Sequence, residues 1–292
     1  MKLNDGYTMM HEHMHIDLSG VKKDQDCCLD CYDEICAELK QLYKQGVRNI
    51  WEVTNIGMGR DISTILKLEE ATGIHFMIST GCYKDPFIPE AMSAFDTEKL
   101  AELMIREINE GIEGTGVKAD AIGEIGTSKN EWTENERKLF DAAIIAHSAT
   151  HKPIYTHTTL ATLAKEQADY LVSHGADPTK VVIGHVDLSG DLDFIRSVLS
   201  TGVTVGFDTI GKNNYLPDQK RIEFLLALEK EGLLNQVVLS EDLTRKSHLK
   251  YKGGIGYCYL FESFIPELLK AGLSQNSIDL MLIENPKRIF SD

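Results

Sequence analysis

The chain has 292 residues, of which 42% are hydrophobic and 26% charged, so its length and composition fit a globular protein with a sizeable core. The formal net charge of −15 argues against nucleic-acid binding, which needs a basic surface on the protein. No apolar run approaches the roughly 20 residues of a membrane-spanning helix, and the first residues lack the apolar segment of a signal peptide. We therefore expect a cytoplasmic protein that binds neither nucleic acid nor membrane, and a homodimer is compatible with the sequence.

Short apolar runs alternate with helical patterns along the whole chain. We interpret the apolar runs as strands, at residues 7–17, 48–54, 75–83, 119–127, 153–159, 181–187, 203–210 and 237–244. Helical patterns occupy residues 29–45, 97–111, 135–150, 160–175, 192–201, 219–231 and 259–271. This alternation predicts parallel βαβ units. Eight of them in a chain of this length predict an α/β fold, a (β/α)8 TIM barrel with residues 1–292 in a single domain.

The alternative is an open, doubly wound sheet. That fold is expected to carry a glycine-rich phosphate-binding turn after the first strand. In this chain the same place holds histidines, in the run His11-Glu12-His13-Met14-His15. Side chains alternate along a strand, so His11, His13 and His15 are expected to share one face. Two imidazoles on one strand face can bind one metal ion, and the spacing alone does not choose between His11 with His13 and His13 with His15.

Further metal-ligating residues lie near the ends of other predicted strands. His157 and His185 occur near the ends of the fifth and sixth strands, and Glu124 ends the fourth. The eighth strand ends in Glu241 and Asp242, of which only one can face the barrel interior, and alternation does not say which. The strand ends of a (β/α)8 barrel converge on its catalytic mouth. A carboxylate in an apolar run such as that around Glu124 is costly to bury unless a cation neutralises it.

These strand-end residues suffice to bind two divalent ions about 3.5–4 Å apart. Mixed nitrogen and oxygen ligands suit Zn, Mn, Co or Fe, and we expect zinc. The cysteines Cys27, Cys28 and Cys31 include one CxxC spacing, but the chain has no second such pair and no downstream histidines at zinc-finger spacing. We interpret all the cysteines as reduced thiols.

At this point the motifs resemble those of the phosphotriesterase family of the amidohydrolase superfamily, over essentially the whole chain. The resemblance is carried by the segments 11–20, 54–60, 124–128, 156–158, 184–188, 207–213 and 239–245. It implies a binuclear metal-dependent hydrolase. It also implies that His11, His13 and Asp242 bind the buried metal, that His157 and His185 bind the more exposed one, and that His15 is a barrel-interior residue.

The chain departs from the family pattern at Glu124. Characterised phosphotriesterases and lactonases of the family bridge the two metals with a carboxylated lysine at this position. A glutamate can bridge two metals with its own carboxylate, so we expect Glu124 to be the bridging ligand. The altered span of that ligand makes triesterase activity less expected than hydrolysis of a carboxylic ester or lactone, including a phosphorylated one.

Asp242 is the expected catalytic residue, which takes a proton from the attacking water and passes it to the leaving group. The expected substrate is a small ester, lactone or phosphoester. The loops that follow the strands hold a local excess of cations in an acidic chain, which predicts an anchor for an anionic substrate. The expected substrate-binding residues are Tyr83, Lys84, Lys212 and Arg245.

Three other functions compete with this one. A phosphotriester or phosphoester hydrolase would use the same two metals. A mononuclear deaminase of the same superfamily would hold one metal ion per chain instead of two. A non-catalytic metal-binding barrel would bind metal and turn over no substrate.

Overall fold

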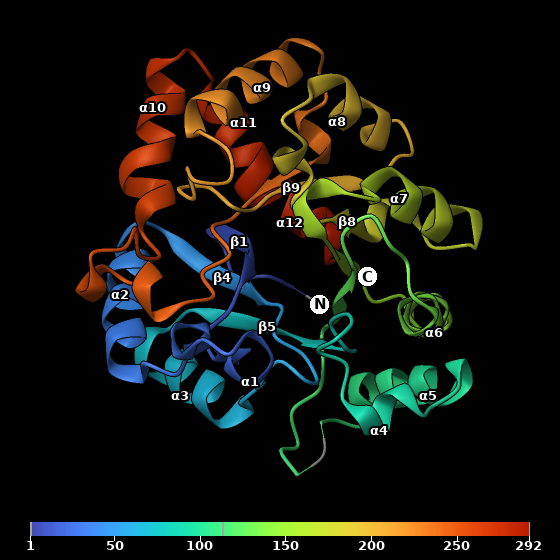
Figure 1. The fold of residues 1–292 in the computed structure, drawn as a ribbon. Coiled ribbons are helices and arrows are strands. Elements are labelled where there is room, and N and C mark those ends of the chain that lie inside the picture. Colours follow the sequence, from blue (N-terminus) through green and yellow to red (C-terminus); the bar gives the residue numbers. More distant parts are fainter. Residues whose placement is uncertain (1, 113, 292) are drawn as a thin grey trace.

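The computed structural model describes residues 2–112 and 114–291. Within these ranges, eight parallel strands form one sheet in the order in which they follow along the chain, and helices surround them (Figure 1). The strands are β1 (Tyr7–Glu12), β4 (Val47–Glu52), β5 (His75–Thr80), β6 (Ala121–Thr127), β7 (Ile154–Thr158), β8 (Val181–Ile183), β9 (Thr204–Phe207) and β10 (Val237–Leu239).

The first and last strands meet through a buried carboxylate. Glu12, at the end of β1, accepts hydrogen bonds from the Ser240 hydroxyl at 2.8 Å and from the backbone N–H groups of Glu241 at 2.7 Å and Leu243 at 3.1 Å. A buried carboxylate needs such donors, because its desolvation is otherwise costly. These bonds join β1 to the segment after β10, and the sheet is a nearly closed barrel. The predicted (β/α)8 fold is confirmed.

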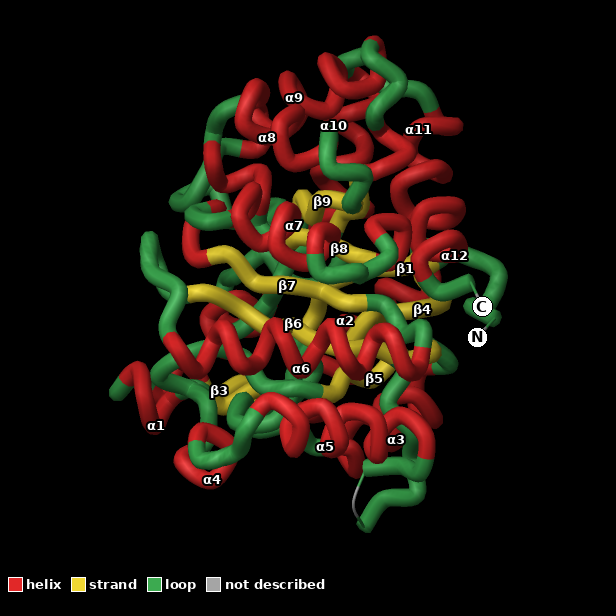
Figure 2. The backbone as a smooth tube through the Cα atoms, turned by 90° about the vertical axis from the view of Figure 1, so that its right-hand side faces the viewer, coloured by secondary structure: helices red, strands yellow, loops and turns green. Residues whose placement is uncertain are grey.

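Helices cover the outside of the barrel (Figure 1). The longer helices are α2 (Tyr32–Lys44), α3 (Ile62–Thr72), α5 (Thr97–Asn109), α6 (Glu134–Thr150), α7 (Ala164–Ser173), α8 (Leu192–Leu199), α9 (Asp218–Lys230) and α10 (Ile265–Lys270). The short ones are α1 (Ser19–Lys22), α4 (Glu90–Ser93), α11 (Gln275–Asp279) and α12 (Asn285–Ile289). In Figure 2, α1 and α4 lie at the opposite end of the barrel from the two chain termini.

Smaller elements complete the connections. The antiparallel pair β2 (Ile16–Asp17) and β3 (Cys28–Leu29) follows β1. Two π-helical segments, η8 (Leu260–Phe264) and η9 (Leu280–Glu284), run directly into α10 and α12. Short 3-10 helices are η1 (Gln25–Cys27), η2 (Thr159–Ala161), η3 (Pro178–Lys180), η4 (Val186–Ser189), η5 (Leu234–Gln236), η6 (Lys246–His248) and η7 (Lys250–Lys252).

Two buried clusters divide the core. The larger one lies between the sheet and the helices, and the smaller one fills the barrel. Inside the barrel, the Trp51 ring contacts Phe290 at a centroid distance of 4.8 Å and Tyr155 at 5.0 Å. Tyr155 in turn lies 4.8 Å from the ring of His11. The column of aromatic rings therefore fills the barrel interior up to the level of the histidines.

Both β1 and β6 carry a one-residue register shift where their candidate ligands lie. In β1, Met9 pairs with Ile50 but Glu12 pairs with Glu52, so two residues of β1 oppose one of β4. This count is that of a β-bulge, which re-aims side chains. It explains why Met10 belongs to the barrel-interior cluster while the next residue, His11, also faces the interior.

The equivalent shift in β6 lies between Ile122 and Ile125, around Gly123 and Glu124. Gly123 has a φ of +123°, and a Cβ at this position would lie 2.1 Å from the carbonyl oxygen of Tyr155. Only glycine fits this conformation and this close approach. The glycine that precedes Glu124 therefore allows β6 to turn the carboxylate into the barrel mouth.

The structure differs from the sequence-based prediction at several boundaries. The predicted strand 7–17 ends at Glu12, because the bulge and the following turn interrupt it. The predicted helix 259–271 begins with the π-helical segment Leu260–Phe264. The prediction missed α3 altogether, although Asp61 caps its first turn and Gly73, with a φ of +76°, ends it.

Two further observations bear on the predictions from composition. Among the described residues, no helix combines the length and the apolar character needed to cross a membrane. The cysteines are free thiols, and Cys27, Cys36, Cys82 and Cys258 are buried.

The bulge in β6 generates a stability prediction. Gly123→Ala is expected to lower the free energy of unfolding by about 2–5 kcal/mol, because it adds an overpacking clash to the cost of a positive φ. Gly175 also has a positive φ, +98°, but a Cβ there meets nothing within 4 Å. Gly175→Ala is therefore the matched control, with an expected loss of about 1–2 kcal/mol. Urea titration of both variants measures the difference, and equal losses would contradict the steric argument.

Candidate metal centre

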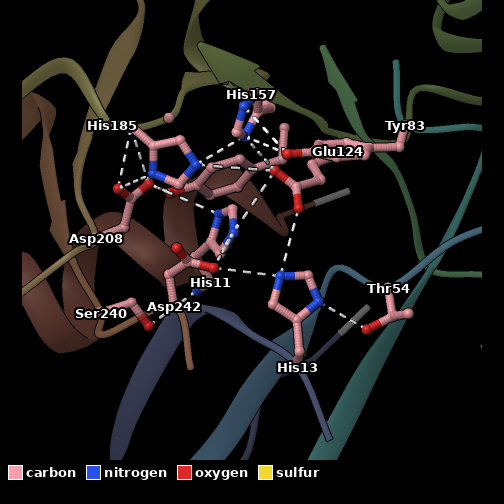
Figure 3. Close-up of polar contacts among 12 residues, drawn as sticks. His11, His13, Thr54, Tyr83, Glu124, His157, His185, Asp208, Ser240 and Asp242 are labelled. Carbon is pink, nitrogen blue, oxygen red and sulfur yellow. Dashed lines mark hydrogen bonds and ion pairs between the residues drawn. The ribbon is translucent and has the colours of Figure 1, made fainter. Parts of the chain in front are cut away.

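The six predicted metal ligands lie together at one end of the barrel (Figure 3). His11 and Glu124 come from the bulged strands β1 and β6, and His157 comes from β7. His185 and Asp242 follow β8 and β10 in left-handed backbone conformations, with φ values of 59° and 53°. His13 lies just beyond β1. The site is thus built from the carboxyl ends of five strands, where (β/α)8 barrels place their active sites.

His11 and His13 direct unpartnered nitrogens into the centre of the site. Both side chains are fully buried, and neither His11 Nε2 nor His13 Nε2 has a hydrogen-bond partner. The other nitrogen of His13, Nδ1, lies 2.8 Å from the hydroxyl of Thr54, which fixes the ring orientation. Buried polar atoms are rarely left without a partner. Two such nitrogens beside two carboxylates fit the ligand set of a metal ion.

Glu124 lies between the histidines with its two oxygens on different neighbours. Its Oε1 is 3.4 Å from His13 Nε2, and its Oε2 is 3.1 Å from His157 Nδ1. Oε2 also lies 3.7 Å from His11 Nε2. The side chain is 2% exposed, and its backbone carbonyl accepts a hydrogen bond of 2.8 Å from the Asn55 amide. This is the arrangement that a carboxylate bridging two cations requires.

His157 and His185 approach each other from neighbouring strands. His185 Nε2 lies 2.9 Å from His157 Nδ1, so these two nitrogens face the same point. The other nitrogen of His185, Nδ1, lies 2.7 Å from Asp208 Oδ1. The second oxygen of Asp208 accepts a hydrogen bond of 2.7 Å from the Tyr155 hydroxyl. A carboxylate behind a histidine is the usual partner that orients a metal-binding imidazole.

The two carboxylate oxygens of Asp242 contact different neighbours, histidines on one side and a lysine on the other. Oδ1 lies 3.6 Å from His11 Nε2 and 3.4 Å from His13 Nε2. Oδ2 accepts a hydrogen bond of 2.6 Å from Lys212 Nζ, which also donates to the Asp242 carbonyl. The neighbouring Glu241 is buried and accepts from the backbone N–H of Leu260, away from the site. The strand pattern left open whether Glu241 or Asp242 faces the interior. In the structure, Asp242 faces the histidines and Glu241 does not.

The pKa values show how strongly these groups interact. Burial raises the pKa of Glu124, but the opposing effect of His11 and the other histidines is larger. The pKa of Glu124 therefore lies well below its usual value. Burial lowers the pKa of His13, but Asp242 and Glu124 outweigh this effect and raise it to about 10. Burial also lowers the pKa of His185, but the carboxylate of Asp208 outweighs this effect and raises that pKa to about 9. The carboxylates thus stabilise positive charge here, whether it is a proton on an imidazole or a bound cation.

A cavity of about 360 Å³ opens above these ligands. His157, His185 and Asp242 lie at its floor, and its walls include Phe87 and Tyr215. Of the residues predicted to bind substrate, Tyr83 and Lys84 line this cavity. The Tyr83 hydroxyl lies 3.1 Å from His157 Nε2.

The other two predicted substrate-binding residues have carboxylate partners and do not line the cavity. Lys212 is 6% exposed and bonded to Asp242. Arg245 lies 2.8 Å from Asp24 and 3.4 Å from Asp26, in a surface ion-pair cluster. Their predicted roles stay predictions that no contact with the cavity supports.

His15 does not lie in the barrel interior. Its ring is partly exposed and its Nδ1 lies 2.7 Å from the carbonyl oxygen of Gly59, in the loop after β4. The expectation that His11, His13 and His15 share one strand face was wrong, because β1 ends at Glu12 and the alternation ends with it.

Sequence reasoning missed three residues of this region. Asp208 orients His185, Glu12 bonds to the backbone around Asp242, and Lys22 lines the cavity. Asp208 directly follows the apolar strand β9, which is the same signal that pointed to Glu124. Lys22 gives no such signal, because it lies in the loop region after β1, and its position depends on how that loop folds.

Comparison with known proteins agrees with this geometry. A family model described as the phosphotriesterase family matches residues 2–290. The chain belongs to the phosphotriesterase family. The phosphotriesterase homology protein of Escherichia coli is 50% identical and covers 98% of both chains. Its crystal structure, described as complexed with phosphate in the active site, superimposes with a TM-score of 0.96 at 49% identity, covering 98% of this chain and 99% of that one.

More distant relatives are named for several hydrolytic reactions. An aryldialkylphosphatase of Saccharolobus solfataricus is 31% identical, covering 98% of this chain and 95% of its own. An N-acetyltaurine hydrolase of Dictyostelium discoideum is 31% identical over 87% of this chain and 72% of its own. The crystal structure of a Listeria monocytogenes lactonase has a TM-score of 0.92 at 28% identity, covering 98% and 94%. Membership of this phosphotriesterase family makes the chain a metal-dependent hydrolase.

The residues present fit the metal that the family implies. Two groups of side chains place their ligand atoms within 4.8 Å of one another, His11 with His13 and Asp242, and His11 with Glu124 and His185. The unpartnered nitrogens of His11 and His13 support the same conclusion independently. The number and identity of the ions belong to the proposal below.

The contact of Asp208 with His185 generates a prediction on metal affinity. Asp208→Asn removes the negative charge behind the imidazole, so we expect zinc affinity to fall by about 10–100-fold. Competition with a chelator of known zinc affinity measures this. Asp193→Asn is the control with the same charge change, because Asp193 is 87% exposed and its carboxylate pairs with Arg196. Equal affinities in the two variants would contradict the role given to Asp208.

Proposed function

We propose that this protein uses two divalent metal ions to hydrolyse a carboxylic ester or lactone, with zinc as the first choice of metal. The observation that carries the proposal is the divided environment of Glu124. One oxygen faces His13 and the other faces His157, as a carboxylate shared by two ions would. His11, His13 and Asp242 would hold one ion, and His157 and His185 the other. Mn, Co or Fe would suit the same ligands.

Divalent ions held by these residues would supply Lewis-acid polarisation of the scissile carbonyl group and would lower the pKa of water. The protein's own contribution begins with Asp242. Its side chain is 15% exposed toward the cavity, so it can reach both the attacking water and the leaving group. Asp242 accepts the proton of the water and returns it to the leaving group. Lys212 fixes the orientation of that carboxylate through Oδ2, which leaves Oδ1 facing the histidines.

An acyl substrate is favoured for two reasons. Acyl transfer makes few demands on the leaving group, and the lactonase of Listeria monocytogenes shares the fold over nearly the whole chain. The second candidate is phosphoester hydrolysis. The phosphate in the active site of the Escherichia coli relative favours it, at 49% identity, and so does the relative named aryldialkylphosphatase. The amide hydrolysis in the name of the N-acetyltaurine hydrolases is a further acyl reaction for a substrate panel to include.

The proposed role of Asp242 generates a prediction on turnover. Asp242→Asn is expected to retain metal and to lose at least about 100-fold in kcat, because the amide cannot accept the proton. Elemental analysis counts the ions, and steady-state kinetics on a panel of lactones, carboxylic esters, phosphoesters and amides measures turnover. A kcat near that of the unmodified protein on its best substrate would contradict the proton-transfer role.

The same panel separates the alternatives. His157→Asn is expected to reduce the metal content from two ions per chain toward one. A metal content of one ion in the unmodified protein would favour the mononuclear deaminase. Fully loaded protein that turns over no member of the panel would favour a non-catalytic metal-binding barrel.

A further inference from the structure

Two lysines stand at the wall of the cavity above the candidate metal centre. Lys84 follows Tyr83 in the loop after β5, and Lys22 is the last residue of α1. Both line the cavity whose floor holds His157 and Asp242. They come from loops after two different strands, β1 and β5, so the barrel fold brings them to the same opening.

Neither lysine has a carboxylate partner. Among the residues that the structure describes, no Asp or Glu oxygen lies within 4.0 Å of the ammonium of Lys22 or Lys84, whereas Lys212 and Arg245 are both paired. The hydrogen bond of Lys84 is a long one, 3.3 Å, to the carbonyl oxygen of Asp85. Two lysines without a carboxylate oxygen at that distance thus line one cavity in a chain of net charge −15.

The electrostatic environment makes this arrangement costly without an anion. Lys84 is partly buried, and its Nζ lies 5.6 Å from the ring centre of Tyr83. Burial lowers the pKa of Lys84, Glu136 raises it, and the positive charge of Lys22 lowers it again. The positive charge of the exposed Lys22 thus repels the partly desolvated ammonium group of Lys84. A negatively charged group between them would relieve the repulsion and complete the hydrogen bonds of Lys84.

We propose that Lys84 and Lys22 form an anion subsite, so that the substrate carries a phosphate, carboxylate or sulfonate group at some distance from the scissile bond. The reaction on that substrate rests on the function proposed above, whereas the anion binding does not. The cavity volume of about 360 Å³ limits the substrate to a small molecule. Phe87 and Leu160 also line the cavity and provide apolar surface for the carbon skeleton of the substrate.

Paired substrates test the subsite in the metal-loaded protein. The pair is a neutral γ-lactone and the same lactone with a phosphate ester on its side chain. Lys84→Gln is expected to lower kcat/KM for the phosphorylated lactone by about 10–100-fold through a higher KM, because it removes a partly desolvated charge contact. Lys22→Gln is expected to lower it by less, because the side chain of Lys22 is exposed and its charge is screened by solvent. Both variants are expected to lower kcat/KM for the neutral lactone by less than for the phosphorylated one.

Lys23→Gln is the matched control. Lys23 adjoins Lys22, but its ammonium donates to the carbonyl oxygen of Gly20 at 2.6 Å and the residue does not line the cavity. Lys23→Gln should change kcat/KM for neither lactone. Equal losses on both lactones in Lys84→Gln would overturn the subsite, because they would indicate a general disturbance of the site. Lactones with a carboxylate or a sulfonate in place of the phosphate show which oxyanion the subsite prefers.

A binding measurement keeps this proposal separate from the proposed reaction. Calorimetric titration of the metal-loaded protein with inorganic phosphate is expected to give a Kd about tenfold weaker in Lys84→Gln than in Lys23→Gln. That result would support the anion subsite even if no lactone were hydrolysed. Equal Kd values in the two variants would overturn the subsite even if hydrolysis were found.

Discussion

The burial of one carboxylate among four imidazoles is the constraint on which the site depends. Glu124 is 2% exposed, and such a group is stable only where positive charge surrounds it. The ring nitrogens of His13 and His157 approach its two oxygens from opposite sides, at 3.4 and 3.1 Å. The barrel meets this requirement by bringing the ends of strands that are distant in sequence to one point. A bound cation would stabilise the same buried carboxylate.

Three of the six candidate ligands are each held by a hydrogen bond with a second residue. Thr54 orients His13, Asp208 orients His185, and Lys212 orients Asp242. Figure 3 shows the contacts of Thr54 with His13 and of Asp208 with His185 at the edges of the cluster. These bonds within the protein orient the side chains of His13, His185 and Asp242, which is the preorganisation that a catalytic site needs. Glu12 adds the mechanical link, because the same carboxylate joins β1 to the backbone next to Asp242.

Much of the fold and most of the ligand set could be predicted from the sequence. Alternation of strand and helix patterns identified the barrel, and histidines at successive strand ends identified its mouth. The register shifts in β1 and β6 could not be predicted, because register depends on the pairing strand and not on the strand's own residues. For the same reason His15 was misplaced. The sequence also could not tell which loop cations line the cavity. In the structure Arg245 pairs with Asp24, whereas Lys22 and Lys84 line the cavity.

The central claim is that Glu124 bridges two metal ions. The most direct measurement is a crystal structure of metal-loaded protein, with anomalous diffraction recorded at the absorption edge of the metal that elemental analysis identifies. The account predicts two anomalous peaks about 3.5–4 Å apart, with one oxygen of Glu124 on each. A single peak at full metal loading, or two peaks with Glu124 bound to only one of them, would contradict it.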